Sequence, residues 1–231
     1  MTELTRRRLL TAGTATAMAS VAGCTGISSD EPTEFTADLA AIPDQDLQAT
    51  DYQKQPVEKR TLDRTFEIAG SEQQVIANYW VSTYIKPRTP DSPSSTFAAI
   101  SSPGAEVLGK NRNPLAQLSN EELISQFMGR LDRLNDVEQQ ETYTTSVFGE
   151  ERTVIVSTAT AEIVEGQESD FHVELASFMH EGDYLVLAGG HPAGTDADVD
   201  YTNLMRIVEH PVDPPEDAQT DSDGSDADTA E

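Results

Sequence analysis

The chain has 231 residues and a formal net charge of −26 at pH 7, from 41 acidic and 15 basic residues. This charge argues against nucleic acid as a partner, because phosphate contacts need a basic surface. A single cysteine excludes an intramolecular disulfide, so packing alone must hold the fold.

The first 23 residues have the layout of an export signal. Three arginines (residues 6–8) precede a weakly apolar run of about 14 residues, which is shorter than the roughly 20 residues of a membrane-spanning helix. The paired Arg6 and Arg7 in front of such a run are typical of the twin-arginine route, which carries folded cargo. We therefore expect residues 1–23 to be a twin-arginine lipoprotein signal peptide.

Cys24 is the only cysteine and directly follows the small residues 21–23. These residues resemble the lipobox of prokaryotic lipoprotein signals, with Val21 in place of the usual leucine. The resemblance implies that Cys24 receives a lipid and becomes the first residue of the mature chain. Cleavage without lipid and a buried cysteine are the alternatives. Residues 24–34 are polar and predict a flexible tether between the lipid and the domain.

The next segment predicts strands. Residues 61–69 alternate, and residues 74–85 are rich in β-branched and aromatic side chains, with a turn signal between them at Gly70. We expect a hairpin, followed by a proline-rich loop and a short strand over residues 96–101.

An irregular stretch leads to the clearest helix signal. Ser119 and Glu122 have the spacing of a capping box, in which each side chain bonds the backbone N–H of the other. Apolar residues then recur at helical spacing, so we expect a helix over residues 121–134.

The sequence predicts four further strands, which form a meander over residues 137–148, 152–164, 170–180 and 184–188. A short helix is expected within residues 198–208. Strands that follow one another in sequence favour antiparallel pairing. We therefore predict an α+β fold, with an antiparallel sheet of about six or seven strands and one or two helices packed on it. The expected domain covers residues 35–210, and residues 211–231 predict a disordered acidic tail.

The chain as a whole resembles an uncharacterised family of haloarchaeal twin-arginine-exported lipoproteins of unknown function. The likeness includes the signal with Cys24, the strand centre Asn78-Tyr79-Trp80, the Asn113-Pro114 pair and the closing Val208-Glu209-His210. It implies a location and a shape, without catalytic residues. The strand order also resembles the PsbP-like fold, a likeness of architecture alone.

Histidines on the last strands raise the question of a metal. His172, His180 and His191 lie on or beside neighbouring predicted strands, near the acidic residues Glu174, Glu181 and Asp183. His172 and Glu174 are two apart, so both should face the same side of the sheet. No zinc motif with fixed spacing accompanies them, and we interpret them as polar residues of a solvated face. We predict no metal site, no cofactor and no catalytic residue.

Four aromatic residues on the predicted strands are expected to be part of the hydrophobic core. Tyr79, Trp80, Tyr84 and Phe97 fill the expected sheet, although a ligand pocket between sheet and helix stays open. Only four lysines accompany the many acids, a composition typical of proteins adapted to concentrated salt.

The sequence thus predicts a lipid-anchored, salt-adapted protein on the outer face of the cell membrane, serving as a binding or interaction module of the cell envelope and not as an enzyme. Its expected partners are the membrane, through Cys24, and other envelope proteins or a small ligand. The alternatives are a small-ligand- or solute-binding lipoprotein, and a metal-dependent surface enzyme.

Overall fold

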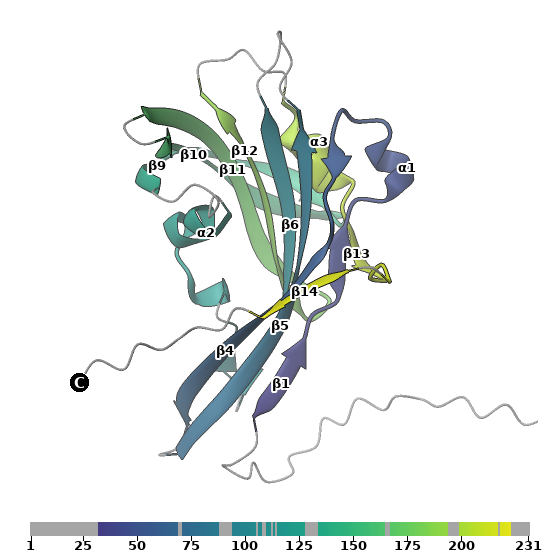
Figure 1. Cartoon of the computed structure of the whole chain (residues 1–231), viewed down its shortest axis with the longest axis vertical. Coiled ribbons are helices and arrows are strands. Elements are labelled where there is room, and N and C mark those ends of the chain that lie inside the picture. The colour runs from purple at the N-terminus through teal and green to yellow at the C-terminus, as the bar shows by residue number, and fades with distance from the viewer. Residues whose placement is uncertain are drawn as a thin grey trace, which may run out of the picture.

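Long strands dominate the computed structural model of the chain (Figure 1). The structure describes residues 32–68, 71–87, 94–104, 106–107, 110–111, 113, 115–127, 134–164, 167–193, 199–216 and 218–222. Cys24, Arg6 and Arg7 lie outside these residues. Within the described part, ten strands form one sheet, whose main path is β14-β4-β5-β6-β12-β11-β10-β9, with β1 and β3 also paired to β5.

The strands of this sheet are β1 (Thr33–Thr36), β3 (Gln53–Lys54), β4 (Glu58–Ile68), β5 (Ser71–Lys86), β6 (Ser95–Pro103), β9 (Leu134–Val147), β10 (Glu150–Val164), β11 (Gln167–His180), β12 (Asp183–Pro192) and β14 (Gln219–Ser222). Two smaller sheets pair β2 (Leu39–Ala41) with β13 (Glu209–Val212), and β7 (Glu106–Val107) with β8 (Lys110–Asn111). The helices are α1 (Asp44–Leu47), α2 (Asn120–Phe127) and α3 (Tyr201–Arg206), with a 3-10 turn over Leu115–Gln117.

The expected hairpin and meander are both present. β4 pairs antiparallel with β5, and β9 to β12 pair antiparallel in sequence order. The two halves join where β12 pairs antiparallel with β6, which places Leu187 opposite Ala99. β6 and β12 therefore lie in the middle of the sheet.

The sheet is mixed, so the prediction of a purely antiparallel sheet with six or seven strands was wrong. β1 runs parallel to β5, and β14 runs parallel to β4. Each is four residues long and pairs with a strand distant in sequence. Such segments have no periodicity long enough to be recognised, and backbone hydrogen bonds order them.

The boundaries of the domain differ from expectation for the same reason. β1 begins at Thr33, inside the expected tether, and β13 continues to Val212. β14 lies within residues 211–231, for which no structure was expected. Residues 223–231 lie outside the described part.

Helices cover both faces of the sheet (Figure 1). Successive residues of β12 show this directly, because Leu185 and Leu187 pack in the cluster that contains α3, whereas Val186 and Ala188 pack in the cluster that contains α2. A strand buried on both faces needs a continuous apolar run, which is what residues 184–188 supply.

The capping box of α2 is confirmed. The backbone N–H of Glu122 donates to Ser119 Oγ over 3.2 Å, and that of Ser119 donates to a Glu122 carboxylate oxygen over 2.7 Å. The hydrogen bond from the Ser119 N–H to the carboxylate lowers the pKa of Glu122. The predicted end of this helix at Leu134 was wrong, because Leu134 is the first residue of β9 and pairs with Ala161, while residues 128–133 lie outside the described part. The short helix near the C-terminus is confirmed as α3, with Asp200 as its N-cap.

No helix of the described residues is sufficiently long and apolar to span a membrane.

Candidate functional site

The β11–β12 hairpin separates the histidines that the sequence placed together. His172 pairs with His191 near one end of the hairpin, and His180 pairs with Asp183 at the other. Eight residues of strand between His172 and His180 correspond to about 26 Å. A single ion therefore cannot bind all three histidines, and the hairpin carries two separate polar clusters.

The turn cluster lies where β11 meets β12. Glu181 and Gly182 form the turn with φ values of 48° and 98°, as a tight hairpin with two left-handed residues requires. His180 ends β11 and Asp183 begins β12, so both side chains are fixed by strand pairing beside the turn.

His210 completes the turn cluster from β13. Its side chain is 0% exposed, and its Nε2 atom lies 3.1 Å from Asp183 Oδ2. The same carboxylate oxygen accepts a hydrogen bond from the Asp38 backbone N–H over 2.7 Å. Ser101 Oγ lies 3.4 Å from it. Because carboxylate oxygens accept hydrogen bonds, Nε2 of His210 carries the ring proton.

The other ring nitrogen of His210, Nδ1, is buried and has no hydrogen-bond partner among the described residues. In the neutral ring with a proton on Nε2, Nδ1 holds a lone pair that can only accept. A buried polar atom left unsatisfied costs about 1–3 kcal/mol, so this lone pair needs an explanation.

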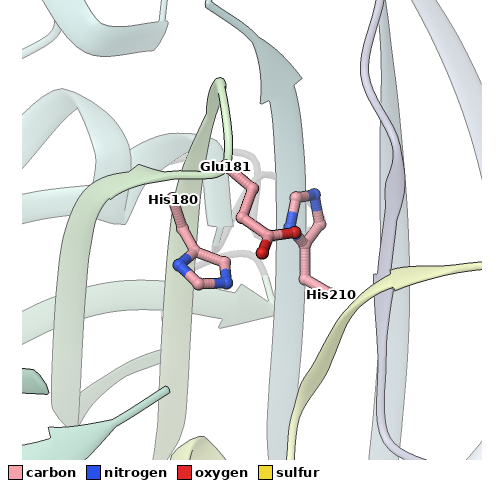
Figure 2. Close-up of side chains that lie close together, drawn as sticks. All are labelled: His180, Glu181 and His210. Carbon is pink, nitrogen blue, oxygen red and sulfur yellow. The ribbon is translucent and has the colours of Figure 1, made fainter. Parts of the chain in front are cut away.

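Three ligand atoms converge at this position. Histidine nitrogens of His180 and His210 and a carboxylate oxygen of Glu181 all lie within 4.8 Å of one another. Figure 2 shows the Glu181 carboxylate reaching from the turn toward the two imidazole rings. The His180 ring stacks on Phe148, with ring centroids 4.1 Å apart, which restrains its orientation.

Ser101, His210 and Asp183 do not form a hydrolytic triad. In that arrangement the acid and the hydroxyl bond opposite nitrogens of the imidazole. Here Ser101 Oγ lies 3.5 Å from Nε2, the nitrogen that already faces Asp183. Ser101 is 0% exposed, which also separates its hydroxyl from solvent.

The second cluster, near the other end of the hairpin, is a network of satisfied groups. His172 Nε2 lies 3.1 Å from Glu174 Oε1, which confirms that both residues face the same side. Tyr143 donates to the other oxygen of Glu174, and His191 Nδ1 lies 3.2 Å from the Tyr201 hydroxyl. The network joins β9, β11, β12 and α3.

The ionisation of this network follows from its burial and hydrogen bonds. Burial alone would raise the pKa of Glu174, but the hydrogen bonds from His172 and Tyr143 outweigh it and the pKa is lowered. Burial, together with the charge of His172, lowers the pKa of His191. Burial raises the pKa of Tyr201, so its hydroxyl stays protonated at neutral pH.

A groove of about 610 Å³ lies beside the turn cluster. It is lined by Thr36, Ala37, Asp38, Leu39, Trp80, Pro211, Val212, Asp213 and Pro214. Trp80 donates its indole N–H to the Ala37 carbonyl over 3.0 Å, and Lys59 Nζ lies 5.7 Å from the centre of its ring. The groove adjoins the turn cluster through two residues: Asp38 lines the groove and bonds Asp183, and His210 directly precedes the lining residue Pro211.

The four aromatic residues expected in the core are all buried, as predicted.

Sequence reasoning missed His210. It follows β12 by 18 residues and belongs to a short strand whose partner, β2, lies near the start of the domain. The available signal was local: a histidine between Val208 and Pro211, in a segment with apolar neighbours, is more buried than the histidines of an alternating strand.

The fold and these clusters define a sheet-centred domain with helices on both faces, a groove and two histidine clusters. The chain belongs to the family described as a domain of unknown function, DUF6517, which matches residues 39–217. No curated protein and no solved structure matches the chain. The expectation of an uncharacterised family is thereby confirmed, while its haloarchaeal origin and the likeness to PsbP stay predictions.

Proposed function

We propose that the chain is an exported lipoprotein, which holds a binding domain at the outer face of the cell membrane. The observation that carries the anchoring is Cys24 directly after a segment with the layout of a twin-arginine signal. Eight residues separate Cys24 from Thr33, where β1 begins. Even a fully extended chain of that length spans no more than about 30 Å, so the lipid would keep the domain close to the membrane surface.

Replacing the lipidated residue tests the anchor. In Cys24→Ser the thiol that forms the thioether with the lipid is lost, and the protein should move from the membrane fraction to the soluble fraction. Arg6→Lys/Arg7→Lys serves as the matched variant for the export route and should leave precursor inside the cell. Membrane retention of Cys24→Ser would refute the anchor.

The groove supports the binding role. Its volume lies within the 300–1,000 Å³ typical of small-ligand sites. Trp80, Leu39 and Val212 supply an apolar lining, and the exposed Asp38 and Asp213 supply negative charge. We place in it a small organic cation, because exposed carboxylates beside an apolar lining favour an ammonium group with apolar substituents.

Trp80 provides the readout, since it is the only tryptophan of the chain. Titration with benzyltrimethylammonium in molar salt should change its fluorescence in a saturable way, and Asp213→Asn should weaken the apparent affinity several-fold. Glu209→Gln, an exposed acid outside the groove lining, is the matched control. A linear change without saturation would contradict this ligand class and leave the anchor test unaffected.

A further inference from the structure

We propose that His180, Glu181 and His210 bind a divalent transition metal ion, with Asp183 orienting His210 from behind. The proposal concerns the domain alone and does not depend on lipid anchoring or on a ligand in the groove. It differs from our expectation of no metal site, because the sequence analysis considered the histidines of the hairpin but not His210.

The unpartnered nitrogen of His210 is the first argument. Nε2 faces Asp183, and Nδ1 is buried without a hydrogen bond in the described structure. Figure 2 shows the ring nitrogen next to the point of attachment lying on the side of the Glu181 carboxylate. A metal ion at this position would accept the lone pair that no group of the described residues satisfies.

The second argument is the arrangement behind the ligands. A histidine that binds a metal generally donates its other N–H to a carboxylate or carbonyl, which fixes the tautomer and the ring. Asp183 has this relation to His210, and its oxygen is held in turn by the Asp38 backbone N–H. Phe148 restrains the second ring, that of His180. The orientations of both imidazole rings are thus restrained before a metal ion binds.

The donor set selects the ion. Two imidazoles and one carboxylate suit zinc, cobalt, nickel or iron(II), whereas magnesium and calcium prefer oxygen donors alone. In a tetrahedral site, bonds of about 2.0–2.2 Å put each pair of ligand atoms about 3.3–3.6 Å apart. The three ligand atoms here lie within 4.8 Å of one another, so binding an ion requires them to close by up to about 1 Å, through rotation of the exposed Glu181 and a small shift of the half-buried His180. Three protein ligands leave a coordination position open toward solvent.

Cobalt(II) tests the site, because tetrahedral nitrogen-containing sites absorb visible light far more strongly than the octahedral, all-oxygen sites of an acidic surface. The full chain would be titrated with Co²⁺ in molar salt, and Zn²⁺ would then be added to displace it. We expect saturable, intense bands at one equivalent that Zn²⁺ abolishes. Weak absorption without saturation would overturn the proposal.

Variants distinguish the proposed ligands from other histidines. His180→Ala and Glu181→Gln should each weaken Co²⁺ binding at least tenfold, and neither side chain is buried, so both variants should fold. His172→Gln, on the other cluster of the same hairpin, should bind as the parent does. Asp183→Asn should weaken binding 10- to 100-fold, as for other partners of metal-binding histidines. Equal affinity in parent, His180→Ala and Glu181→Gln would also overturn the proposal.

Thermal unfolding gives a second readout of metal binding. Zn²⁺ should raise the unfolding midpoint of the parent chain, because an ion that binds only the folded state stabilises it. Glu181→Gln should lose most of this rise while keeping the same midpoint without metal. An equal rise in both proteins would show that Zn²⁺ acts elsewhere.

Discussion

At the scale of single residues, Gly189 sets how closely α3 lies on the sheet. A Cβ atom at this position would meet the Tyr201 ring at 2.1 Å, and Tyr201 is only 1% exposed. Because both groups are buried, neither can move away cheaply. Gly189→Ala should lower the free energy of unfolding by about 1–3 kcal/mol, the usual cost of overpacking.

Chemical denaturation in high salt measures this effect, and a double-mutant cycle with Tyr201→Leu tests its cause. If the clash is responsible, Gly189→Ala should cost much less beside Leu at position 201. Additive costs would mean that the strain lies in the backbone of β12.

His191 gives a second prediction at this scale. Burial lowers its pKa from 6.5 in the folded protein, so the unfolded chain binds a proton more readily between that lowered value and pH 6.5. Stability should therefore fall as the pH drops below 6.5. Glu174 acts in a lower window, because its lowered pKa contributes stability above the unfolded value of 4.5 that is lost as the pH falls through the folded value.

Unfolding curves from pH 7.5 to about 2.5 separate these windows. His191→Gln should flatten the stability profile just below pH 6.5, and Glu174→Gln should flatten it below pH 4.5. An unchanged profile in His191→Gln would assign the acid sensitivity to other groups.

Single residues also show what the sequence could not reveal. His172 and Glu174 could be placed on one face because strand geometry alone fixes their relation. The turn around Glu181 could likewise be inferred from the predicted strands 170–180 and 184–188, which it joins. The contact between His180 and His210 depends on β13 crossing to pair with β2, a long-range event that no local pattern encodes. Two of the three proposed ligands, His180 and Glu181, could therefore be noticed in the sequence, whereas His210 could not.

At the scale of elements, β14 is the clearest departure from expectation. Four residue pairs join it to β4, from Gln219–Glu58 to Ser222–Thr61. Without it, part of β4 becomes an exposed edge with unpaired backbone groups, a template for association.

Two truncations test its role. A chain ending at residue 217, where the family match ends, should lose about 1–3 kcal/mol of stability, since each backbone hydrogen bond contributes about 0.5–1.5 kcal/mol net. It should also self-associate more in sedimentation experiments. A chain ending at residue 222 keeps β14 and is the control. Identical behaviour of both would make β14 dispensable.

The long elements were readable from sequence, whereas the short ones were not. β5 and β10 carry extended runs of β-branched residues, and residues 119–122 carry their own capping hydrogen bonds, so local signals sufficed. β1, β3 and β14 have two to four residues each and obtain their order from the edges they join. Their pairing made the sheet mixed and larger than predicted.

At the scale of the whole molecule, the net charge of −26 has consequences for folding itself. Acidic side chains are distributed along the strands as well as at the C-terminus, and many that the structure describes are exposed, such as Asp63, Glu72 and Glu138. Folding brings these charges together, and their mutual repulsion opposes the compact state. Few cations are available to offset it, since only 15 residues are basic.

Dissolved salt should screen the acidic charges that the few basic residues do not neutralise. The screening length is about 10 Å at 0.1 M salt and about 3 Å at 1 M, which is shorter than most separations between surface charges. We therefore expect the unfolding midpoint to rise steeply as KCl increases from 0.1 to 2 M, with the domain largely unfolded at the lower end. Sucrose at matched osmolality separates charge screening from general exclusion effects, because it strengthens burial without screening charge. An equal rise with sucrose, or full stability in 0.1 M KCl, would mean that packing across β6 and β12 outweighs the repulsion and that the acidic surface serves solubility alone.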